Sequence, residues 1–327
     1  MVLPVMNFEE MPAVKTFTLH HASTATATTV PSATHTPQPP EAVVPSMTWQ
    51  EVGPGGMRAL WTVTILMGIA SLVFYLLTSK ITVQKRLPIL LVSLISTTSF
   101  FAYYAMATGD GVGYSLRQIH HTHDHRPDTY EGIYRAIYWP RWVNWTITSN
   151  ISLFLLTLIS GLNGAGLLVL LAANTFMYIA AGAGAMGSHH EYKWGWYIIA
   201  LFSYLMMVYQ CLIKGRNAAL VKDAKSRRFF MVVSGFYFLT VLAYPIVFGL
   251  GSYAHRISVN AEVITFAVLD VLSQGLFCFL VLTGQDVIPA ISEDVGGFWS
   301  YGTNNQGAIH IDNEDDEDGY DDEGRHW

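Results

Sequence analysis

The sequence predicts an all-α integral membrane protein with seven transmembrane helices. Hydrophobic residues make up 51% of the 327-residue chain and charged residues only 13%, a balance that is typical of membrane proteins. Seven apolar stretches are each long enough to cross a hydrocarbon core of about 30 Å at a rise of about 1.5 Å per residue. The two cysteines, Cys211 and Cys278, both lie inside apolar stretches, so no disulfide framework is expected.

The seven expected spans occupy the middle of the chain, and we assign residues 56–285 to one helical domain. The spans cover residues 57–79, 87–109, 136–161, 164–186, 194–213, 229–251 and 260–283. Because residues 1–55 are rich in Ser, Thr and Pro, we expect them to be a disordered segment. They have no apolar core followed by a cleavage site, so we do not expect a signal peptide there. Residues 286–327 form a separate C-terminal tail.

Basic residues in the links between spans predict the orientation, because positively charged links stay in the cytoplasm. The basic residues after the first and fifth spans are Lys80, Lys85, Arg86, Lys214, Arg216, Lys222, Lys225, Arg227 and Arg228. Both links lie on the same side of the membrane. We therefore expect an extracellular N-terminus and a cytoplasmic C-terminal tail, with the lipid bilayer as the main partner.

The C-terminal tail is strongly acidic. Its segment 312–323 holds nine of the 24 acidic residues and, with Arg325, gives the tail a formal charge of about −8 in a chain whose net charge is −6. Such a tail is either solvated or docks to a basic partner, for example another membrane protein. We expect no nucleic-acid partner, and the sequence leaves the oligomeric state open.

Two charged residues stand inside apolar spans. Asp270 lies in the run FAVLDVLSQGLFCFLVL, where a carboxylate costs about 2.5–3.5 kcal/mol unless it is paired or hydrated. Arg141 lies in YWPRWVNWTITSN, and we expect it to form a couple with Asp270, directly or through water. Alternatively, Arg141 reaches the headgroups and Asp270 is protonated and bonded to a backbone carbonyl. The expected intramembrane polar network comprises Arg141, Asn144, Asp270, Gln274 and Glu262.

Three motifs at fixed places in the order of spans resemble microbial (type 1) rhodopsins. They are RWVNWT in the third span, YPIVFGLGS in the sixth and VLDV in the seventh. The resemblance covers about residues 55–285 and implies a seven-helix bundle of the microbial rhodopsin type. It further implies a retinal pocket, of which the expected vestigial lining comprises Trp145, Thr148, Met177, Tyr244 and Phe248. Phe248 and Val241 stand where the family has tryptophans.

The chain departs from the light-driven members of that family at three positions. Gln274 stands at the position of the lysine that binds retinal as a Schiff base, Asn144 at that of the acidic counterion, and Leu155 at that of the proton donor. Loss of the lysine and the counterion together leaves the interior charge balanced. All seven lysines lie outside the spans or at their edges: Lys15, Lys80, Lys85, Lys193, Lys214, Lys222 and Lys225. We therefore expect no cofactor, in particular no covalently bound retinal, and no proton pumping.

These departures resemble the lysine-lacking branch of fungal opsin-related proteins, which includes heat-induced plasma-membrane proteins. The resemblance implies a plasma-membrane scaffold or chaperone-like regulator in the stress response, and no enzyme activity. A second hypothesis is a sensor or carrier that binds a small apolar ligand such as retinal without a covalent bond. A third, which family membership alone would suggest, is a light-responsive pump or channel, and the missing lysine argues against it.

A cluster of histidines lies in the long outer link between the second and third spans. The sequence HHTHDH there contains the weak metal-ligand candidates His120, His121, His123 and His125. These residues follow no fixed ligand spacing of a known metal site. We therefore expect a solvated loop and no bound metal.

Overall fold

Seven long apolar helices make up most of the described chain. The structure, a computed structural model, describes residues 46–81, 86–122, 129–187, 190–222 and 224–284. The helices able to cross a membrane are Pro54–Lys80, Arg86–Thr108, Pro140–Ser160, Gly164–Met186, Tyr192–Ala219, Ala224–Tyr253 and Val259–Thr283. The predicted all-α membrane fold with seven spans is thereby confirmed.

The first four spans are single helices, whereas the last three contain π-helical turns. The single helices are α1 (Pro54–Lys80), α2 (Arg86–Thr108), α3 (Pro140–Ser160) and α4 (Gly164–Met186). The fifth span joins α5 (His190–Val208) to α6 (Arg216–Ala219) through a π turn, Tyr209–Gly215. The sixth is α7 (Ala224–Phe248) with a π turn at Gly249–Tyr253. The seventh joins α8 (Val259–Asp270) to α9 (Phe277–Thr283) through the π turn Val271–Leu276.

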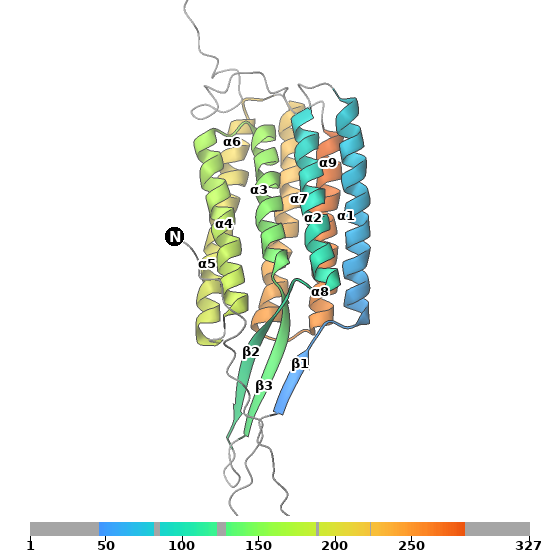
Figure 1. Ribbon diagram of the computed structural model, residues 1–327. Helices are drawn as coiled ribbons and strands as arrows, with labels where there is room; N and C mark the ends of the chain where they lie inside the picture. Colours follow the sequence, from blue (N-terminus) through green and yellow to red (C-terminus); the bar gives the residue numbers. More distant parts are fainter. Residues whose placement is uncertain (1–45, 82–85, 123–128, 188–189, 223, 285–327) are drawn as a thin grey trace, which may run out of the picture. The chain divides into compact units, whose positions relative to one another are not determined.

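The helices pack side by side as a bundle (Figure 1). Helix α1 contacts α2 and α8, α2 contacts α3, α3 contacts α4, and α4 contacts α5. Helix α7 contacts both α3 and α8. The π turn of the seventh span faces the interior, where Ser273 and Gln274 are buried directly after Asp270. Single π turns inside helices often mark functional sites.

Apolar side chains cover the outside of the bundle, and polar ones lie within it. Leu72, Phe202 and Leu239 on three different spans are 67%, 69% and 71% exposed. Exposed apolar surface on this scale is typical of a protein that faces lipid. Asp270 and Ser99, by contrast, are completely buried, so the interior contains the polar groups that bear on function.

A three-stranded sheet extends from one end of the bundle (Figure 1). Its strands are β1 (Ser46–Gln50), β2 (Val112–His121) and β3 (Thr129–Tyr138), in the order β1-β3-β2. Strands β2 and β3 form an antiparallel hairpin, and β1 runs parallel to β3. By the predicted orientation, this sheet lies on the outer side of the membrane.

The sheet corrects two expectations. The solvated loop expected for residues 120–125 is wrong for His120 and His121, which lie in β2, and the third span, expected from residue 136, begins at Pro140 because β3 precedes it. The expected disorder of residues 1–55 is wrong for residues 46–55, since β1 and the start of α1 lie there. The β-branched and aromatic residues of TYEGIYRAIY are the sequence signal for β3. Residues 1–45, 285–327, His123 and His125 lie outside the described residues.

Glycine at position 109 ends α2 with a left-handed backbone conformation, φ = +89°. A Cβ atom at this position would meet no neighbouring atom within 4 Å, so only the backbone conformation opposes a side chain there. Gly235, within α7, has equally open surroundings but a helical conformation. The two positions therefore separate conformational strain from steric contact.

We predict that Gly109→Ala lowers the free energy of unfolding by about 1–2 kcal/mol, the cost of a left-handed conformation at a residue with a Cβ atom. Gly235→Ala should instead raise it by about 0.5–1 kcal/mol through higher helix propensity. Thermal unfolding in one detergent measures both changes. Equal shifts of the same sign would contradict the assigned conformation of Gly109.

Candidate functional site

The Asp270 carboxylate forms the centre of the buried polar site. It accepts hydrogen bonds from Tyr103 Oη at 2.5 Å, Tyr244 Oη at 2.6 Å and Trp145 Nε1 at 2.7 Å. These donors come from α2, α7 and α3, so three helices converge on one side chain of α8. A carboxylate accepts hydrogen bonds without donating any, and this donor shell meets that requirement.

Arg141 and Asp270 are both described by the structure, but they form no direct ion pair. The expectation of a direct couple is therefore wrong. Arg141 is 3% exposed, and its Nε and Nη2 atoms find no acceptor in the described protein. Its guanidinium instead lies over the rings of Phe266, Tyr138 and Trp145, at 4.8–5.7 Å from their centroids. Such an arrangement over aromatic faces is a cation–π interaction. The form of the couple in which water joins Arg141 to Asp270 stays a prediction.

A neutral cluster lies next to Asp270, around the amide of Gln274. Ser99 Oγ and Asn144 Nδ2 both donate to Gln274 Oε1, the latter at 3.4 Å, and Gln274 Nε2 donates to Thr148 Oγ1 at 3.2 Å. Ser99 also lies 3.3 Å from Asn144 Oδ1. The structure thus brings together the two amides that the sequence analysis places at the lysine and counterion positions. The Asn144 amide donates a hydrogen bond to the Gln274 amide, and neither side chain carries a formal charge.

Glu262 belongs to a different site from Asp270. It forms an ion pair with Arg135 of β3 at 2.5 Å and accepts a hydrogen bond from Ser252 at 2.7 Å. Arg135 also donates to Gln50 of β1 and to the backbone carbonyl of Ile257. The expectation that Glu262 joins the Arg141 network is therefore corrected: its partner is Arg135, in the link between the second and third spans, which was not among the expected network residues.

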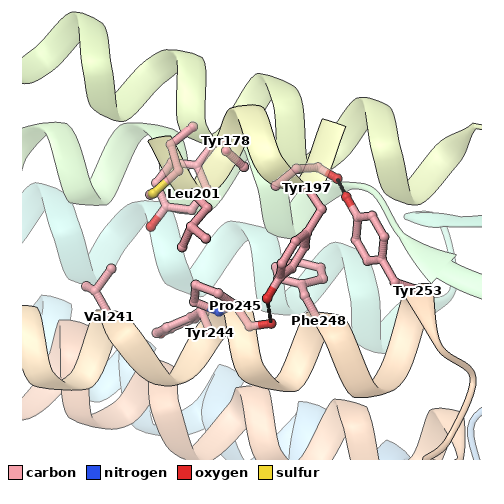
Figure 2. A pocket seen from close by; sticks show the side chains of 11 residues that line it. Tyr178, Tyr197, Leu201, Val241, Tyr244, Pro245, Phe248 and Tyr253 are labelled. Carbon is pink, nitrogen blue, oxygen red and sulfur yellow. Dashed lines mark hydrogen bonds between the residues drawn. The ribbon is translucent and has the colours of Figure 1, made fainter. Parts of the chain in front are cut away.

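Aromatic rings fill most of the expected retinal pocket. Trp145 contacts Tyr244, Phe248 and Phe266 with centroid distances of 5.0–5.4 Å. A cavity of ≈ 40 Å³ remains beside them, between α4, α5 and α7. Figure 2 shows Tyr244 and Phe248 on one wall of this cavity and Tyr178 on another. Met177 also lines it.

A second, smaller cavity lies between this pocket and the Gln274 cluster. Its volume is ≈ 10 Å³, about the space of one water molecule, and its lining includes Thr148, Tyr237 and Gln274. A cavity that binds benzene measures about 150 Å³. Since retinal is larger than benzene and the Gln274 amide forms no Schiff base, the residues present do not fit a covalently bound retinal.

The described lysines lie away from this site. Lys193 is buried near the start of α5, and its Nζ atom lies 3.3 Å from Ser115 Oγ of β2. Lys222 donates to the carbonyl groups of Leu158 and Ile159 at the end of α3. Neither side chain reaches the interior polar groups.

Metal ligands do not gather in the described part of the chain. No group of three or more His, Cys, Asp or Glu residues there is arranged to hold a metal ion. His120 lies on β2, and His121 ends that strand, while His123 and His125 fall outside the described residues. The four histidines therefore stay weak candidates.

The comparison with known proteins identifies the family. A family model described as "Bacteriorhodopsin-like protein" matches residues 57–287. The chain belongs to the bacteriorhodopsin-like family. Opsin-1 of Neurospora crassa is 33% identical to it over 291 residues, which cover 88% of this chain and 96% of that protein. The opsin-like protein carO of Fusarium fujikuroi is 23% identical, and the match covers 70% of this chain and 74% of that protein.

Solved structures of microbial rhodopsins share the fold. The light-driven proton pump LR (Mac) of Leptosphaeria maculans is 38% identical, with a TM-score of 0.70, and the match covers 73% of this chain and 97% of that one. The light-driven proton pump of Coccomyxa subellipsoidea is 25% identical, with a TM-score of 0.66 and coverage of 72% and 99%. This bacteriorhodopsin-like protein is accordingly an integral membrane protein, and its family normally binds retinal.

We predict that the Tyr103 and Asp270 side chains are energetically coupled. Tyr103→Phe removes one hydrogen-bond donor from a buried carboxylate and should lower the free energy of unfolding by about 1.5–3 kcal/mol. In an Asp270→Asn background the same substitution should lower it much less. Thermal unfolding of the four variants in one detergent measures the coupling.

Tyr204→Phe is the matched control for this cycle. Tyr204 is also a buried tyrosine, but it donates to the neutral carbonyl of Phe238 at 3.1 Å. Tyr204→Phe should lower the free energy of unfolding by nearly the same amount in the native chain and in the Asp270→Asn background. The effects of substitutions at sites without shared partners are additive within about 0.5 kcal/mol. Additive losses for Tyr103→Phe as well would contradict the proposed role of Asp270.

Proposed function

We propose that this chain is a non-photochemical opsin-related protein, which acts as a stress-related scaffold or chaperone-like regulator at the plasma membrane. In this proposal it neither binds retinal covalently nor pumps protons. The observation that carries the proposal is the neutral cluster of Gln274 with Ser99, Asn144 and Thr148. A chromophore-bearing lysine and its carboxylate counterion have no counterpart there.

The charge balance of the interior supports this proposal. A single charge at the position of Gln274 or Asn144 would have no partner of opposite sign in the neutral cluster, and a buried unpaired charge costs several kcal/mol. Leu155, at the expected donor position, is completely buried and apolar. The proposed protein therefore keeps the rhodopsin bundle while its interior has no route for a proton through these positions.

The orientation is part of the proposal. Basic side chains gather at the end of the bundle where α9 terminates, including Lys214, Arg216 and Arg228. By the positive-inside tendency, that end faces the cytoplasm and the sheet of β1, β2 and β3 faces outward. The acidic tail then lies in the cytoplasm.

One observation favours a second candidate function, a carrier or sensor for a small apolar ligand. The ≈ 40 Å³ cavity is lined almost entirely by apolar and aromatic side chains, including Leu201, Val241 and Phe248 (Figure 2). Such a lining suits an apolar ligand, provided that the rings move apart to enlarge the space. The light-driven pump activity named for the Leptosphaeria maculans protein is the third candidate, and Gln274 argues against it.

Absorption spectroscopy of the purified protein with all-trans retinal separates the three candidates. The scaffold proposal predicts the spectrum of free retinal, unchanged by the protein. A shifted band that resists hydroxylamine would indicate non-covalent binding and support the carrier. A red-shifted band that hydroxylamine removes would indicate a Schiff base and overturn the proposal.

We predict that Gln274→Lys permits a Schiff base with retinal if the surrounding aromatic rings move apart to make room for it. We also predict that this substitution alone does not restore proton pumping. Asn144 supplies no carboxylate to accept a proton, so transport should also require Asn144→Asp. Light-induced pH changes in proteoliposomes measure this for the single and double variants. Gln274→Met, which is similar in size but carries no amine, is the control. Acidification or alkalinisation by the single Lys variant would refute the division of roles.

A further inference from the structure

An open groove lies at the inner end of the bundle, between the start of α7 and the end of α9. Its volume is ≈ 470 Å³, more than ten times that of the cavity in the aromatic pocket. Phe229 and Val232 supply apolar surface, Lys225 and Arg228 supply cationic side chains, and Thr283 and Gly284 contribute the last turn of α9. The groove thus combines an apolar surface with two positive charges.

Positive charge dominates the surroundings of the groove. Lys225 and Arg228 are exposed, as are Lys214 and Arg216 at the neighbouring end of the fifth span. The described acidic residues lie in the outer segments or inside the bundle: Glu51, Asp110, Glu131, Glu191, Glu262 and Asp270. No acidic residue of the described chain is therefore placed at this inner end, and Asp223 falls outside the described residues.

The chain itself supplies a segment of opposite charge. Gly284 lines the groove, and the chain continues from there into the tail that contains Asp312–Glu323 with nine acidic residues. The 27 residues of 285–311 separate the two, and a chain of this length spans at most about 97 Å, far more than the groove requires. Because the segment is tethered, its effective concentration at the groove is on the order of millimolar.

We propose that the acidic segment Asp312–Glu323 docks in this groove of the same chain and covers the basic surface around Lys225 and Arg228. Tyr320, within the acidic run, supplies an aromatic ring for the surface formed by Phe229 and Val232. Individual exposed ion pairs are weak, but several on a tethered segment act together, and salt screens them. Docking of the acidic segment covers this basic surface. The proposal is independent of whether the protein binds retinal.

Pulsed electron paramagnetic resonance on the full-length protein in phosphatidylcholine nanodiscs tests the proposal. Spin labels are attached through Leu220→Cys, an exposed position at the end of α6, four residues before the start of α7, and through Gly319→Cys, in the acidic segment. The native Cys211 and Cys278 are buried. We expect a short, narrow distance distribution at low ionic strength that becomes broad and longer at high ionic strength. A broad distribution that salt does not change would overturn the proposal.

Charge-reversal variants identify the groove as the docking surface. Lys225→Glu with Arg228→Glu should give the broad distribution at low ionic strength, whereas Lys214→Glu with Arg216→Glu, the same charge change outside the groove, should largely retain the short one. Asp315→Lys, Asp316→Lys and Glu317→Lys should restore the short distance in the first variant. Unchanged thermal unfolding establishes that each variant folds. Failure of this rescue, or equal release by both reversals, would contradict docking in the groove.

Anionic lipid is the competing occupant, and the same labels distinguish it. In nanodiscs that contain phosphatidylserine, a short distance that persists supports docking of the tail over binding of lipid. A short distance that is present in phosphatidylcholine and lost with phosphatidylserine still supports the docking, with lipid as its competitor. A broad distribution in both lipids would assign the groove to something other than the tail and refute the proposal.

Discussion

The Asp270 carboxylate is completely buried in a bundle whose outer surface is apolar, and its need for hydrogen-bond donors constrains three neighbouring helices. An unsatisfied charge at this depth would cost several kcal/mol. Tyr103, Trp145 and Tyr244 meet that need from α2, α3 and α7. Any large rotation of one of these helices would withdraw a donor, so the carboxylate fixes their relative positions.

The amide layer next to Asp270 follows a different rule. Asn144 and Gln274 satisfy each other together with Ser99 and Thr148, and none of the four side chains titrates in the physiological range. Such a cluster is stable without a counterion, a chromophore or a change of protonation state. The carboxyl group at position 270 and the amide at position 274, about one helical turn apart on the seventh span, therefore find their buried hydrogen-bond partners in two different sets of side chains.

The seven spans could be predicted from the sequence because length and apolarity alone decide which segments cross a membrane. The partners of Asp270 could not. An arginine in an apolar span is conspicuous, whereas Tyr103 and Tyr104 are adjacent and indistinguishable in sequence, although only Tyr103 faces the carboxylate and Tyr104 is 48% exposed. The sheet was missed for a related reason, because β1 is short and pairs with β3 more than 80 residues away.

Arg135 shows how the missed sheet bears on the candidate site. Its guanidinium joins Gln50 of β1 to Glu262 of α8, so the three-stranded sheet holds the same helix that presents Asp270. Because Glu262 precedes Asp270 by about two helical turns, buried polar contacts hold the seventh span near its start and again near its middle.

The C-terminal end of the seventh span is held differently. In α9, as far as the structure describes it, the buried side chains are Phe277, Cys278 and Val281, whose contacts with neighbouring helices are apolar and non-directional. A displacement at this end would break none of the buried hydrogen bonds that hold the span at Glu262 and Asp270. The groove beside Lys225 and Arg228 opens at this same end. A segment or partner that binds there therefore meets the part of the seventh span whose movement is opposed least, and the rigid polar core remains intact while it binds.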